Sequence, residues 1–344
     1  PALVPYQIIE EHLKKQSIIL DPFSGCGTTL LEGLLAGHHV IGNDTNYIAN
    51  LISTVKITNT LKKHIQLGQS LTNSLSDFIP NKYSPKVITE FDNKDHWFQN
   101  NVQKEIEFIK EKIYTCNDVV TSNILKLTLS SIIISVSNQD SDTRYEAIDK
   151  AIKDFQTIKL FQKKYEAITS AIKESSGKID SSLNRKIFFE DSRILSSIKP
   201  KSVDLIITSP PYANTYDYYL YHKHRMNWLD FDFKESKSLE IGSRMQFSSR
   251  KDDVSVWEKD IYEFMDAMKM TLKTKGIIAI IIGDSVINKN LFNALSCVKN
   301  IGKKLNLNFL YSESTPLSKN TKKFNHKWRT KLEKYEHMIS LQKK

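Results

Sequence analysis

The apolar positions of this chain form short strand-like runs at both ends, separated by a long stretch with helical periodicity. Near the amino terminus, Ile18–Leu20 and His39–Gly42 are short apolar runs, and Leu30–Ala36 between them has helical spacing with Gly37 placed to end it. Pro5–Lys15 also has a helical pattern, with its apolar residues on one face. A strand, a glycine turn, a helix and a second strand predict the first half of a nucleotide-binding α/β sheet.

The carboxyl-terminal part of the chain returns to the strand pattern. We expect strands at Lys186–Phe189, Leu205–Ile207, Gly276–Ile282, Leu307–Tyr311 and His337–Leu341. A short helix is expected after Arg193 and up to Ile198, and longer helices are expected from Val256 to Leu272 and from Leu291 to Ile301. The run at Gly276–Ile282 is the most apolar, which indicates a strand inside a parallel sheet.

The middle of the chain has a different character. Val102–Tyr114 and Ala147–Ile172 predict amphipathic helices, and Ser137–Tyr145 predicts a polar loop. Ile124–Val136 is apolar enough for a buried helix, although its β-branched residues leave a strand open. The aromatic group His96-Trp97-Phe98 favours an anchor in the core over a contact with nucleic acid.

Together these patterns predict an α/β protein in which a mostly helical segment interrupts the sheet. Residues 1–50 form the first part of the sheet domain, 51–182 the helical insertion and 183–344 the second part of the sheet domain.

The segment after the first strand carries the first candidate site. It reads Asp21-Pro-Phe-Ser-Gly-Cys-Gly-Thr-Thr29. Gly25 and Gly27 can adopt backbone conformations that larger residues avoid, and they let the backbone approach a ligand closely. The next helix can hold an anionic group at its amino terminus, and Asp44 after the second strand can accept hydrogen bonds from ribose hydroxyls. No Gly-Lys-(Ser/Thr) follows the glycines, which argues against an ATP-binding P-loop.

A second candidate site lies where the strand at Leu205–Ile207 stops at Ser209-Pro-Pro-Tyr212. Two prolines can neither donate to a β-ladder nor sit inside a helix, so the strand must end there. The corner presents the Ser209 hydroxyl, the Pro210 carbonyl and the Tyr212 ring at the carboxyl edge of the sheet, where α/β proteins bind ligands.

These two segments together resemble the S-adenosylmethionine-dependent DNA amino-methyltransferases, whose catalytic motif is (Asp/Asn/Ser)-Pro-Pro-(Tyr/Phe/Trp). The resemblance covers about residues 18–50 and 186–344, and it includes the turn at Asp191-Ser192. It implies a Rossmann-like methyltransferase sheet, mostly parallel with an antiparallel last strand, and S-adenosyl-L-methionine as the cofactor.

The resemblance also implies which residues form the site. The implied cofactor-binding residues are Asp21, Pro22, Phe23, Gly25, Gly27, Thr28, Asp44, Asp191 and Ser192. The implied catalytic residues are Ser209, Pro210, Pro211 and Tyr212. In this scheme the target base leaves the duplex and stacks on Tyr212. For Asp191, a helix cap is the alternative to a contact with the cofactor's adenine.

The sequence departs from many relatives in the order of its motifs, in the place of its helical segment and in the element before the first strand. The cofactor motif precedes the catalytic motif, whereas many relatives have the reverse order. The helical segment falls between the second and third strands, and we expect target recognition there. The family's extra cofactor element, which usually lies just before the first strand, is here only Pro1–Ser17.

Ser209 at the first motif position is more typical of cytosine-N4 than of adenine-N6 enzymes, so we expect methylation of cytosine N4. Adenine N6 is the first alternative, followed by an RNA or protein N-methyltransferase. A basic nucleic-acid-binding module that has kept only a relic of the fold is the remaining alternative.

The positive net charge favours binding to a polyanionic partner, since the 344 residues carry a charge of +10 and the pI is about 9.2. We expect double-stranded DNA, with a cognate restriction endonuclease as a further candidate partner and the oligomeric state left open. The candidate DNA contacts are Tyr216, Arg225, Arg244, Arg250 and Lys251. For the last three, a solvated loop is an equally good interpretation.

Cys26, Cys116 and Cys297 are odd in number and widely spaced, which argues against a disulfide framework or a zinc site. We therefore expect no metal and a reducing, cytoplasmic environment. We also expect no membrane association, because the sequence shows no signal-peptide pattern and no apolar stretch that we judge long enough to span a bilayer.

Overall fold

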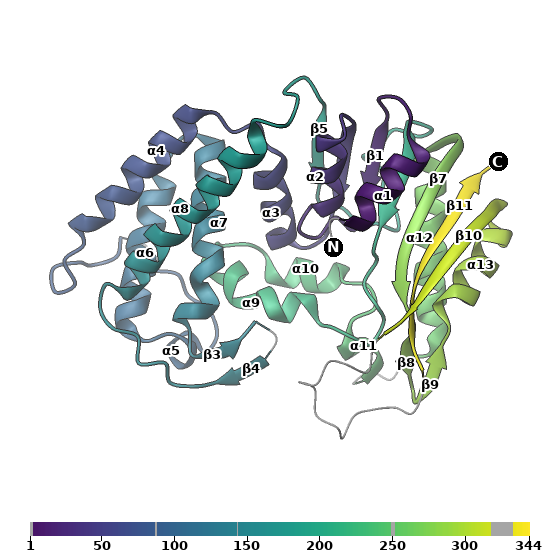
Figure 1. Cartoon of the computed structure of the whole chain (residues 1–344). Coiled ribbons are helices and arrows are strands. Elements are labelled where there is room, and N and C mark those ends of the chain that lie inside the picture. Colours follow the sequence, from purple (N-terminus) through teal and green to yellow (C-terminus); the bar gives the residue numbers. More distant parts are fainter. Residues whose placement is uncertain (1–2, 87, 143, 249–251, 318–332) are drawn as a thin grey trace. The chain divides into compact units, whose positions relative to one another are not determined.

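The computed structural model describes residues 3–86, 88–142, 144–248, 252–317 and 333–344 (Figure 1). The chain forms two compact units. The first comprises residues 1–46, 182–218 and 239–344, and the second comprises 47–181 and 219–238. The second unit therefore includes 219–238, which the boundaries expected from the sequence assign to the sheet domain.

A seven-stranded sheet forms the centre of the first unit, in the order β10-β11-β7-β6-β1-β2-β5. The strands are β1 (Ile18–Asp21), β2 (His39–Asn43), β5 (Arg185–Phe188), β6 (Val203–Thr208), β7 (Leu272–Gly283), β10 (Leu307–Pro316) and β11 (Tyr335–Lys343). β11 runs antiparallel to β7 and β10, and the other neighbouring strands pair in parallel. The prediction of a mostly parallel sheet with an antiparallel last strand is confirmed.

The strand order reverses between β1 and β6, which are neighbours through the pairs Ile19–Leu205 and Leu20–Ile206. From β1 the sheet continues outward through β2 to β5, and from β6 it continues through β7 and β11 to β10. In open α/β sheets, ligands bind beyond the carboxyl ends of the strands at this point of reversal.

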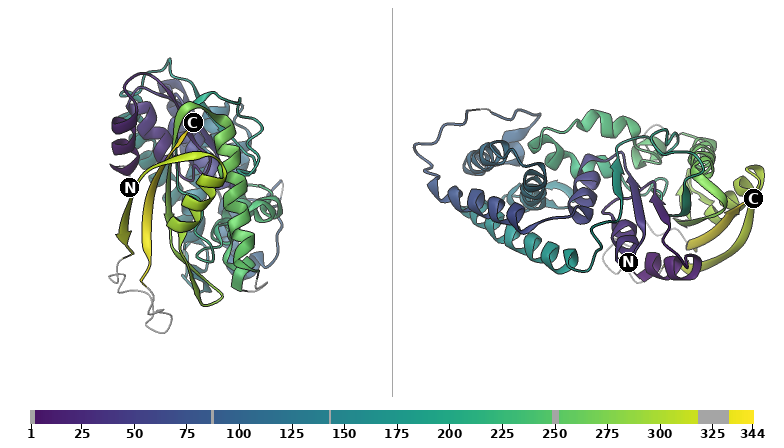
Figure 2. Two further views of the ribbon diagram at one scale, coloured as in Figure 1. Left: turned by 90° about the vertical axis from the view of Figure 1, so that its right-hand side faces the viewer. Right: turned by 90° about the horizontal axis from the view of Figure 1, so that it is seen from above.

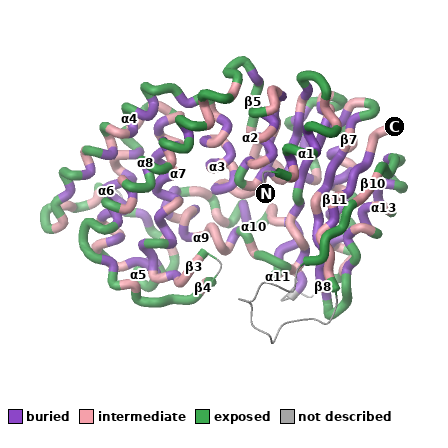
Figure 3. The backbone as a smooth tube through the Cα atoms, viewed as in Figure 1, coloured by how far each residue is buried: buried purple, intermediate pink, exposed green. Residues whose placement is uncertain are grey.

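Helices cover both faces of this sheet (Figure 2). They are α1 (Leu3–His12) and α2 (Thr28–Leu35) on one face, and α12 (Val254–Thr271) and α13 (Ala294–Lys304) on the other. Side chains alternate along each strand. Accordingly Ile19 and Leu205 cluster with Ile9 of α1, whereas Leu20 and Ile206 belong to the cluster that contains Phe264 of α12. The edge strand β10 is largely exposed (Figure 3).

The second unit is mostly helical. Its elements are α3 (Tyr47–Ile57), α4 (Lys62–Asn73), a 3₁₀ turn (Ser74–Asp77), α5 (Lys94–Trp97), α6 (Asn100–Tyr114), α7 (Val119–Val136), the hairpin β3 (Gln139–Ser141) and β4 (Arg144–Ala147), α8 (Gln156–Ser176), α9 (Tyr218–Trp228) and α10 (Phe233–Leu239). Met226 and Trp228 of α9 are buried in the same core as Trp97 and Phe98. The expected core role of the His96-Trp97-Phe98 group is thereby confirmed for its two large rings.

α7 corrects one sequence expectation, because by length and composition alone this helix is long and apolar enough to cross a membrane. More than half of it is buried inside the protein, where it packs against α8, α3, α4 and α6. It serves as the central core helix of the second unit, and its composition is weak evidence for a membrane.

Several predicted elements differ in their bounds. Residues 191–200 form turns instead of the short helix expected after Arg193, and Leu195 has the left-handed φ of 48° there. α8 begins at Gln156 instead of Ala147, because Ala147 ends the strand β4 and residues 148–155 form an irregular connection. Leu291 lies in a second hairpin, β8 (Ser285–Ile287) and β9 (Asn290–Phe292), so α13 starts later than expected. The polar segment after Gly242 contains a short helix, α11 (Arg244–Ser248).

A carboxylate from another helix caps the amino terminus of α8. The N-cap residue Phe155 has a left-handed φ of 64° and a side chain that cannot accept a hydrogen bond. Glu105 of α6 accepts hydrogen bonds from the backbone N–H groups of Phe155 (2.6 Å) and Ile158 (2.9 Å). Glu105 is fully buried, and this burial raises its pKa.

We predict that Glu105→Ala lowers the free energy of unfolding by about 2 kcal/mol, because the buried N–H of Ile158 and the part-buried N–H of Phe155 lose their acceptor. Glu105→Gln keeps one acceptor oxygen, so its loss should be smaller. Urea denaturation checks both values, with Glu166→Ala on the exposed side of α8 as the control. Equal stability of Glu105→Ala and the control would contradict the capping role.

Candidate functional site

A buried hydrogen bond joins the carboxyl ends of β1 and β6. The hydroxyl of Thr208, the last residue of β6, donates to Oδ1 of Asp21, the last residue of β1, over 2.7 Å. The backbone N–H of Phe23 donates to the same oxygen at 3.2 Å. The glycine turn begins after Asp21 and the two-proline corner begins after Thr208, so the two predicted motifs lie side by side at one edge of the sheet.

The glycine turn has the backbone geometry that its sequence predicts. Gly25 and Gly27 have φ values of 48° and 71°, in the region that favours glycine, and α2 begins at the next residue, Thr28. The Gly27 N–H donates to the Ser24 carbonyl over 2.7 Å, which closes the turn. The carboxylate of Asp44 accepts from the Gly25 N–H over 2.8 Å, so the end of β2 is tied to the turn.

Asp21 is buried and Asp44 is half-buried, and the carboxyl groups of both hold their protons more strongly than usual. Burial raises the pKa of Asp21 to about 6, against hydrogen bonds from Thr208, Thr29 and Phe23 that lower it. Burial also raises the pKa of Asp44 to about 6, although backbone N–H groups donate to it. These are the perturbed carboxyl groups that functional sites often contain.

Two further observations at the turn fit a polar ligand such as S-adenosyl-L-methionine. A Cβ added to Gly25 would meet only the Phe23 carbonyl oxygen, at 4.0 Å, so the backbone is open there. The Ser24 hydroxyl is buried, and it has no hydrogen-bond partner among the residues that the structure describes. A buried hydroxyl without a partner is costly unless a ligand or water completes it.

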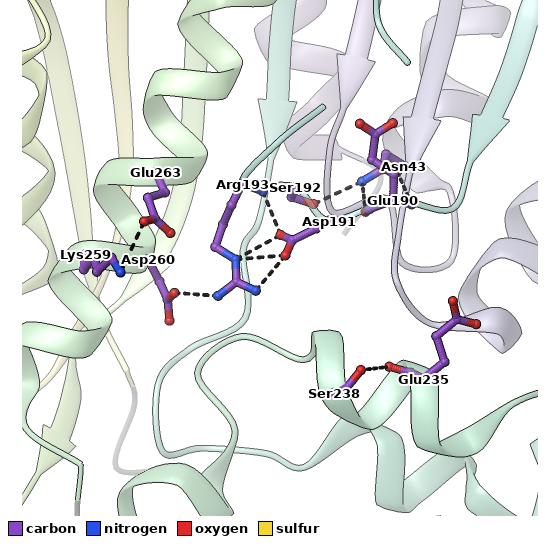
Figure 4. Close-up of polar contacts among 10 residues, drawn as sticks. All are labelled: Asn43, Glu190, Asp191, Ser192, Arg193, Glu235, Ser238, Lys259, Asp260 and Glu263. Atoms are coloured by element: carbon purple, nitrogen blue, oxygen red, sulfur yellow. Dashed lines mark hydrogen bonds and ion pairs between the residues drawn. The ribbon is translucent and has the colours of Figure 1, made fainter. Parts of the chain in front are cut away.

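The Asn43 side chain links the loops that surround the glycine turn by hydrogen bonds (Figure 4). This residue was not among the site residues predicted from the sequence. Its side-chain amide donates to the carbonyls of Pro22 (3.3 Å) and Glu190 (2.9 Å) and to the Ser192 hydroxyl (3.1 Å). Its Oδ1 accepts from the Glu190 N–H over 3.0 Å. Ser192 in turn donates to the Pro22 carbonyl over 2.6 Å. The only sequence signal for Asn43 is its place at the carboxyl end of a strand that neighbours β1.

Asp191 is held by an arginine that the sequence analysis also missed. The Arg193 guanidinium donates to both carboxylate oxygens of Asp191, with Nη2–Oδ2 at 2.6 Å, and its Nη1 donates to Asp260 of α12 at 2.8 Å (Figure 4). These two carboxylates raise the pKa of Arg193. The Asp191 carboxylate also accepts the Arg193 backbone N–H over 2.9 Å, which stabilises the local turn. The structure therefore shows Asp191 as a turn-capping residue that is ion-paired with Arg193.

The Ser-Pro-Pro-Tyr corner leaves its serine accessible. Ser209 is exposed, Pro210 is buried and Pro211 is half-buried. The Tyr212 ring is also half-buried, and its hydroxyl donates to Oε1 of Glu336 on β11 over 2.7 Å. The sequence analysis did not select Glu336, because nothing in the pattern links the last strand to this corner.

The candidate DNA contacts lie in different parts of the chain. Tyr216 and Arg244 are exposed in the first unit, where the Arg244 N–H donates to the Tyr216 carbonyl over 3.2 Å. Arg225 belongs to the second unit, and its guanidinium donates to the Ser130 and Tyr221 carbonyls and pairs with Asp142. Arg250 and Lys251 lie outside the described residues.

Within the described part of the chain, no group of three or more His, Cys, Asp or Glu residues is arranged to hold a metal ion. The three cysteines are free thiols, with Cys26 exposed and Cys297 buried.

Comparison with known proteins places these features in a family context. The model of the N6/N4 methyltransferase family, described as DNA methylase, matches residues 1–53 and 203–340. The Type II methyltransferase M.MvaI of Kocuria varians is 22% identical over 289 residues, which cover 76% of this chain and 60% of that protein. M.MjaII of Methanocaldococcus jannaschii, also a Type II methyltransferase, is 25% identical over 86% of this chain and 71% of its own length.

A third relative, the Type II methyltransferase M.BsoBI of Geobacillus stearothermophilus, is 25% identical over 83% of this chain and 61% of its own length. The chain thus spans between 60% and 71% of the length of these relatives. Among solved structures, an S-adenosylmethionine-dependent methyltransferase of Methanosarcina mazei aligns over 98% of this chain and 96% of its own, at 10% identity and a TM-score of 0.37.

The buried carboxyl of Asp21 gives a pH-dependent prediction. Its pKa is about 6 in the folded protein and 3.8 as its ordinary value, so the folded state binds more protons between these limits. The contribution of Asp21 to the free energy of unfolding is therefore largest at low pH. It falls by up to about 3 kcal/mol as the pH rises from about 4 to about 6.

Asp21→Asn should flatten this part of the stability curve, since the amide does not titrate. Urea unfolding at a series of pH values between about 4 and about 7 measures the effect. Glu10→Gln on the exposed side of α1 serves as the control and should follow the wild-type curve. Parallel curves for Asp21→Asn and the wild type would show that Asp21 does not titrate in this range.

Proposed function

Because the chain belongs to the N6/N4 DNA methylase family, we propose that it transfers a methyl group from S-adenosyl-L-methionine to the exocyclic amine of a base in double-stranded DNA. The observation that carries this proposal is the Asp21–Thr208 hydrogen bond, which keeps the glycine turn and the Ser-Pro-Pro-Tyr corner at neighbouring strand ends. A methyl donor at the turn and a base at the corner are then within reach of each other.

We assign the cofactor to the turn and its neighbouring loops. Gly25 and Gly27 provide the close backbone approach, Asp44 faces the ribose, and the Asp191-Ser192 turn lies toward the adenine. The amino terminus of α2 at Thr28 suits the carboxylate of the methionine part. Ser24 completes its hydrogen bonding with this ligand, which is why its hydroxyl lacks a partner within the described chain.

The exocyclic amine of a base is a weak nucleophile, because its lone pair is delocalised into the ring. Methyl transfer therefore requires groups that make this amine more reactive. The Ser209 oxygen and the Pro210 carbonyl accept hydrogen bonds from the amine hydrogens, which localises the lone pair on nitrogen. S-adenosyl-L-methionine supplies the methyl group on a positively charged sulfur. The rigid proline pair fixes both acceptors, and Tyr212 provides the surface on which the flipped base stacks.

We propose cytosine N4 as the target because serine stands first in the motif. Adenine N6 is the alternative within the same family. The second unit, which is mostly helical, is our candidate for target recognition. Double-stranded DNA is then the partner, and the net charge of +10 favours binding to its phosphates. A cognate restriction endonuclease is a further candidate partner, since the relatives named above are Type II methyltransferases.

Product analysis tests the proposed reaction. Purified protein incubated with tritiated S-adenosyl-L-methionine should label unmethylated duplex DNA in preference to RNA. Hydrolysis of the DNA to nucleosides should place the label in N4-methylcytosine. Label in N6-methyladenine would replace the cytosine proposal with the adenine alternative, and label in RNA alone would contradict the DNA substrate.

The Ser209→Ala variant tests the assigned acceptor. Loss of one preorganised hydrogen bond to the reacting group should lower kcat about 100-fold. The Kd for S-adenosyl-L-methionine, measured by calorimetry, should stay close to the wild-type value. Ser196→Ala, an exposed serine on the turn before β6, is the matched control. Full activity of Ser209→Ala would remove this residue from the mechanism.

A further inference from the structure

The Tyr212 ring is held by two residues from neighbouring strands. A Cβ added to Gly283 at the end of β7 would lie 2.8 Å from Cε2 and 3.0 Å from Cδ2 of Tyr212, so the ring packs directly on the glycine backbone. The Tyr212 hydroxyl donates to Oε1 of Glu336 over 2.7 Å. One residue thus supports the ring, and the other holds its far end.

Gly283 and Glu336 are themselves directly paired across β7 and β11. The spacing between the support and the acceptor is therefore set by the ladder of the sheet. The bond to Glu336 fixes where the tip of the Tyr212 ring lies, and the contact of Cδ2 and Cε2 with Gly283 limits rotation of the ring about its long axis.

A buried carboxylate fixes the start of β11, where Glu336 lies. Asp284 accepts hydrogen bonds from the backbone N–H of Tyr335 (3.0 Å) and from the N–H of Ala294 at the start of α13 (2.9 Å). The same carboxylate lies 3.1 Å from Nε2 of His337. Both chain neighbours of Glu336 are thereby attached to Asp284, which is itself buried. The position of Glu336 relative to Gly283 is consequently determined by several independent bonds.

We propose that Glu336 is a positioning residue for the reaction: through the hydroxyl of Tyr212 it fixes the tip of the ring, and with it the tilt of the surface on which the target base stacks. This inference rests on the proposed function, since a stacking surface matters only if a base enters the corner. The effect is on alignment of the base with the methyl donor, and misalignment of a reacting group lowers kcat.

The ionisation of Tyr212 gives a signature of this contact that does not depend on activity. Burial and the hydrogen bond to Glu336 both raise the pKa of Tyr212, whereas a hydrogen bond from the Ser209 hydroxyl acts in the opposite direction. Removal of Glu336 takes away both its hydrogen bond and its charge, each of which raises the pKa of Tyr212. The Tyr212 hydroxyl should then titrate at a lower pH.

A double-mutant cycle tests the proposal. Glu336→Ala should lower kcat for methyl transfer to DNA about tenfold, because the loss of a hydrogen bond to a charged group releases the ring. Glu336→Gln retains an acceptor oxygen and should recover most of the rate. Tyr212→Phe and the double variant Tyr212→Phe/Glu336→Ala should be equally slow, since Glu336 acts only through the hydroxyl.

Glu313→Ala provides the matched control. Glu313 is an exposed glutamate on β10, and it pairs with Met338 on β11, the strand that also carries Glu336. It should leave kcat unchanged. In every variant the Kd for S-adenosyl-L-methionine should equal that of the wild type. Tyrosine labelled with ¹³C at Cζ, with the Tyr212 signal assigned by its loss in Tyr212→Phe, should titrate at a lower pH in Glu336→Ala than in the wild type.

Three results would overturn the proposal: wild-type kcat in Glu336→Ala, a further loss when Glu336→Ala is added to Tyr212→Phe, or an unchanged titration of the Tyr212 signal. A wild-type protein that methylates no DNA would instead refute the proposed function. In that case the NMR titration still decides whether Glu336 controls Tyr212.

Discussion

The hydrogen bond between Asp21 and Thr208 is the contact on which the arrangement of the candidate site depends. It lies at the centre of the sheet, between the two strands from which the chain proceeds in opposite directions. Parallel pairing fixes the ends of β1 and β6 along the strand direction, and the side-chain bond fixes them at the last residue. Burial favours the protonated form of Asp21, so the same contact links the integrity of this edge to pH.

The edge around this bond is organised by buried polar side chains that bind backbone groups of loops. Asn43 joins the loops after β1, β2 and β5 through its amide, and Asp284 joins β7, α13 and β11 through its carboxylate. Each satisfies N–H or C=O groups that would otherwise be buried without partners. The loops that carry the site are therefore fixed by specific bonds, which is a requirement for catalysis by positioning.

The fold and the two motifs could be predicted because they are local in sequence. The strand at Gly276–Ile282 can be predicted from the apolar residues within that segment, and the turn before α2 from its own glycines. Asn43, Arg193 and Glu336 could not be predicted in the same way, because their partners come from strands and loops far away in the chain. Glu336 contacts Tyr212 across 124 positions, and no periodicity records such a contact.

The failed element predictions have a related cause. The short helix expected after Arg193 is replaced by turns, in which the Asp191 carboxylate binds the arginine and its backbone N–H. Side chains of aspartate that bond to nearby N–H groups compete with helix formation. Likewise α8 begins at the residue after Phe155, where Glu105 of another helix supplies the cap.

The path of the chain relates the second unit to the candidate site. The chain passes into the second unit for the first time at Tyr47, shortly after Asp44, and for the second time at Tyr219, shortly after Tyr212. The first entry thus comes after β2 and the candidate site residue Asp44, and the second comes after β6 and the candidate site residue Tyr212. Residues 219–238 are held in the second unit by the buried side chains of Met226 and Trp228 in α9 and by the ion pair of Lys110 with Asp230. The segment that leaves the Ser-Pro-Pro-Tyr corner therefore continues along the chain into α9, whose Met226 and Trp228 are buried in the core of the second unit.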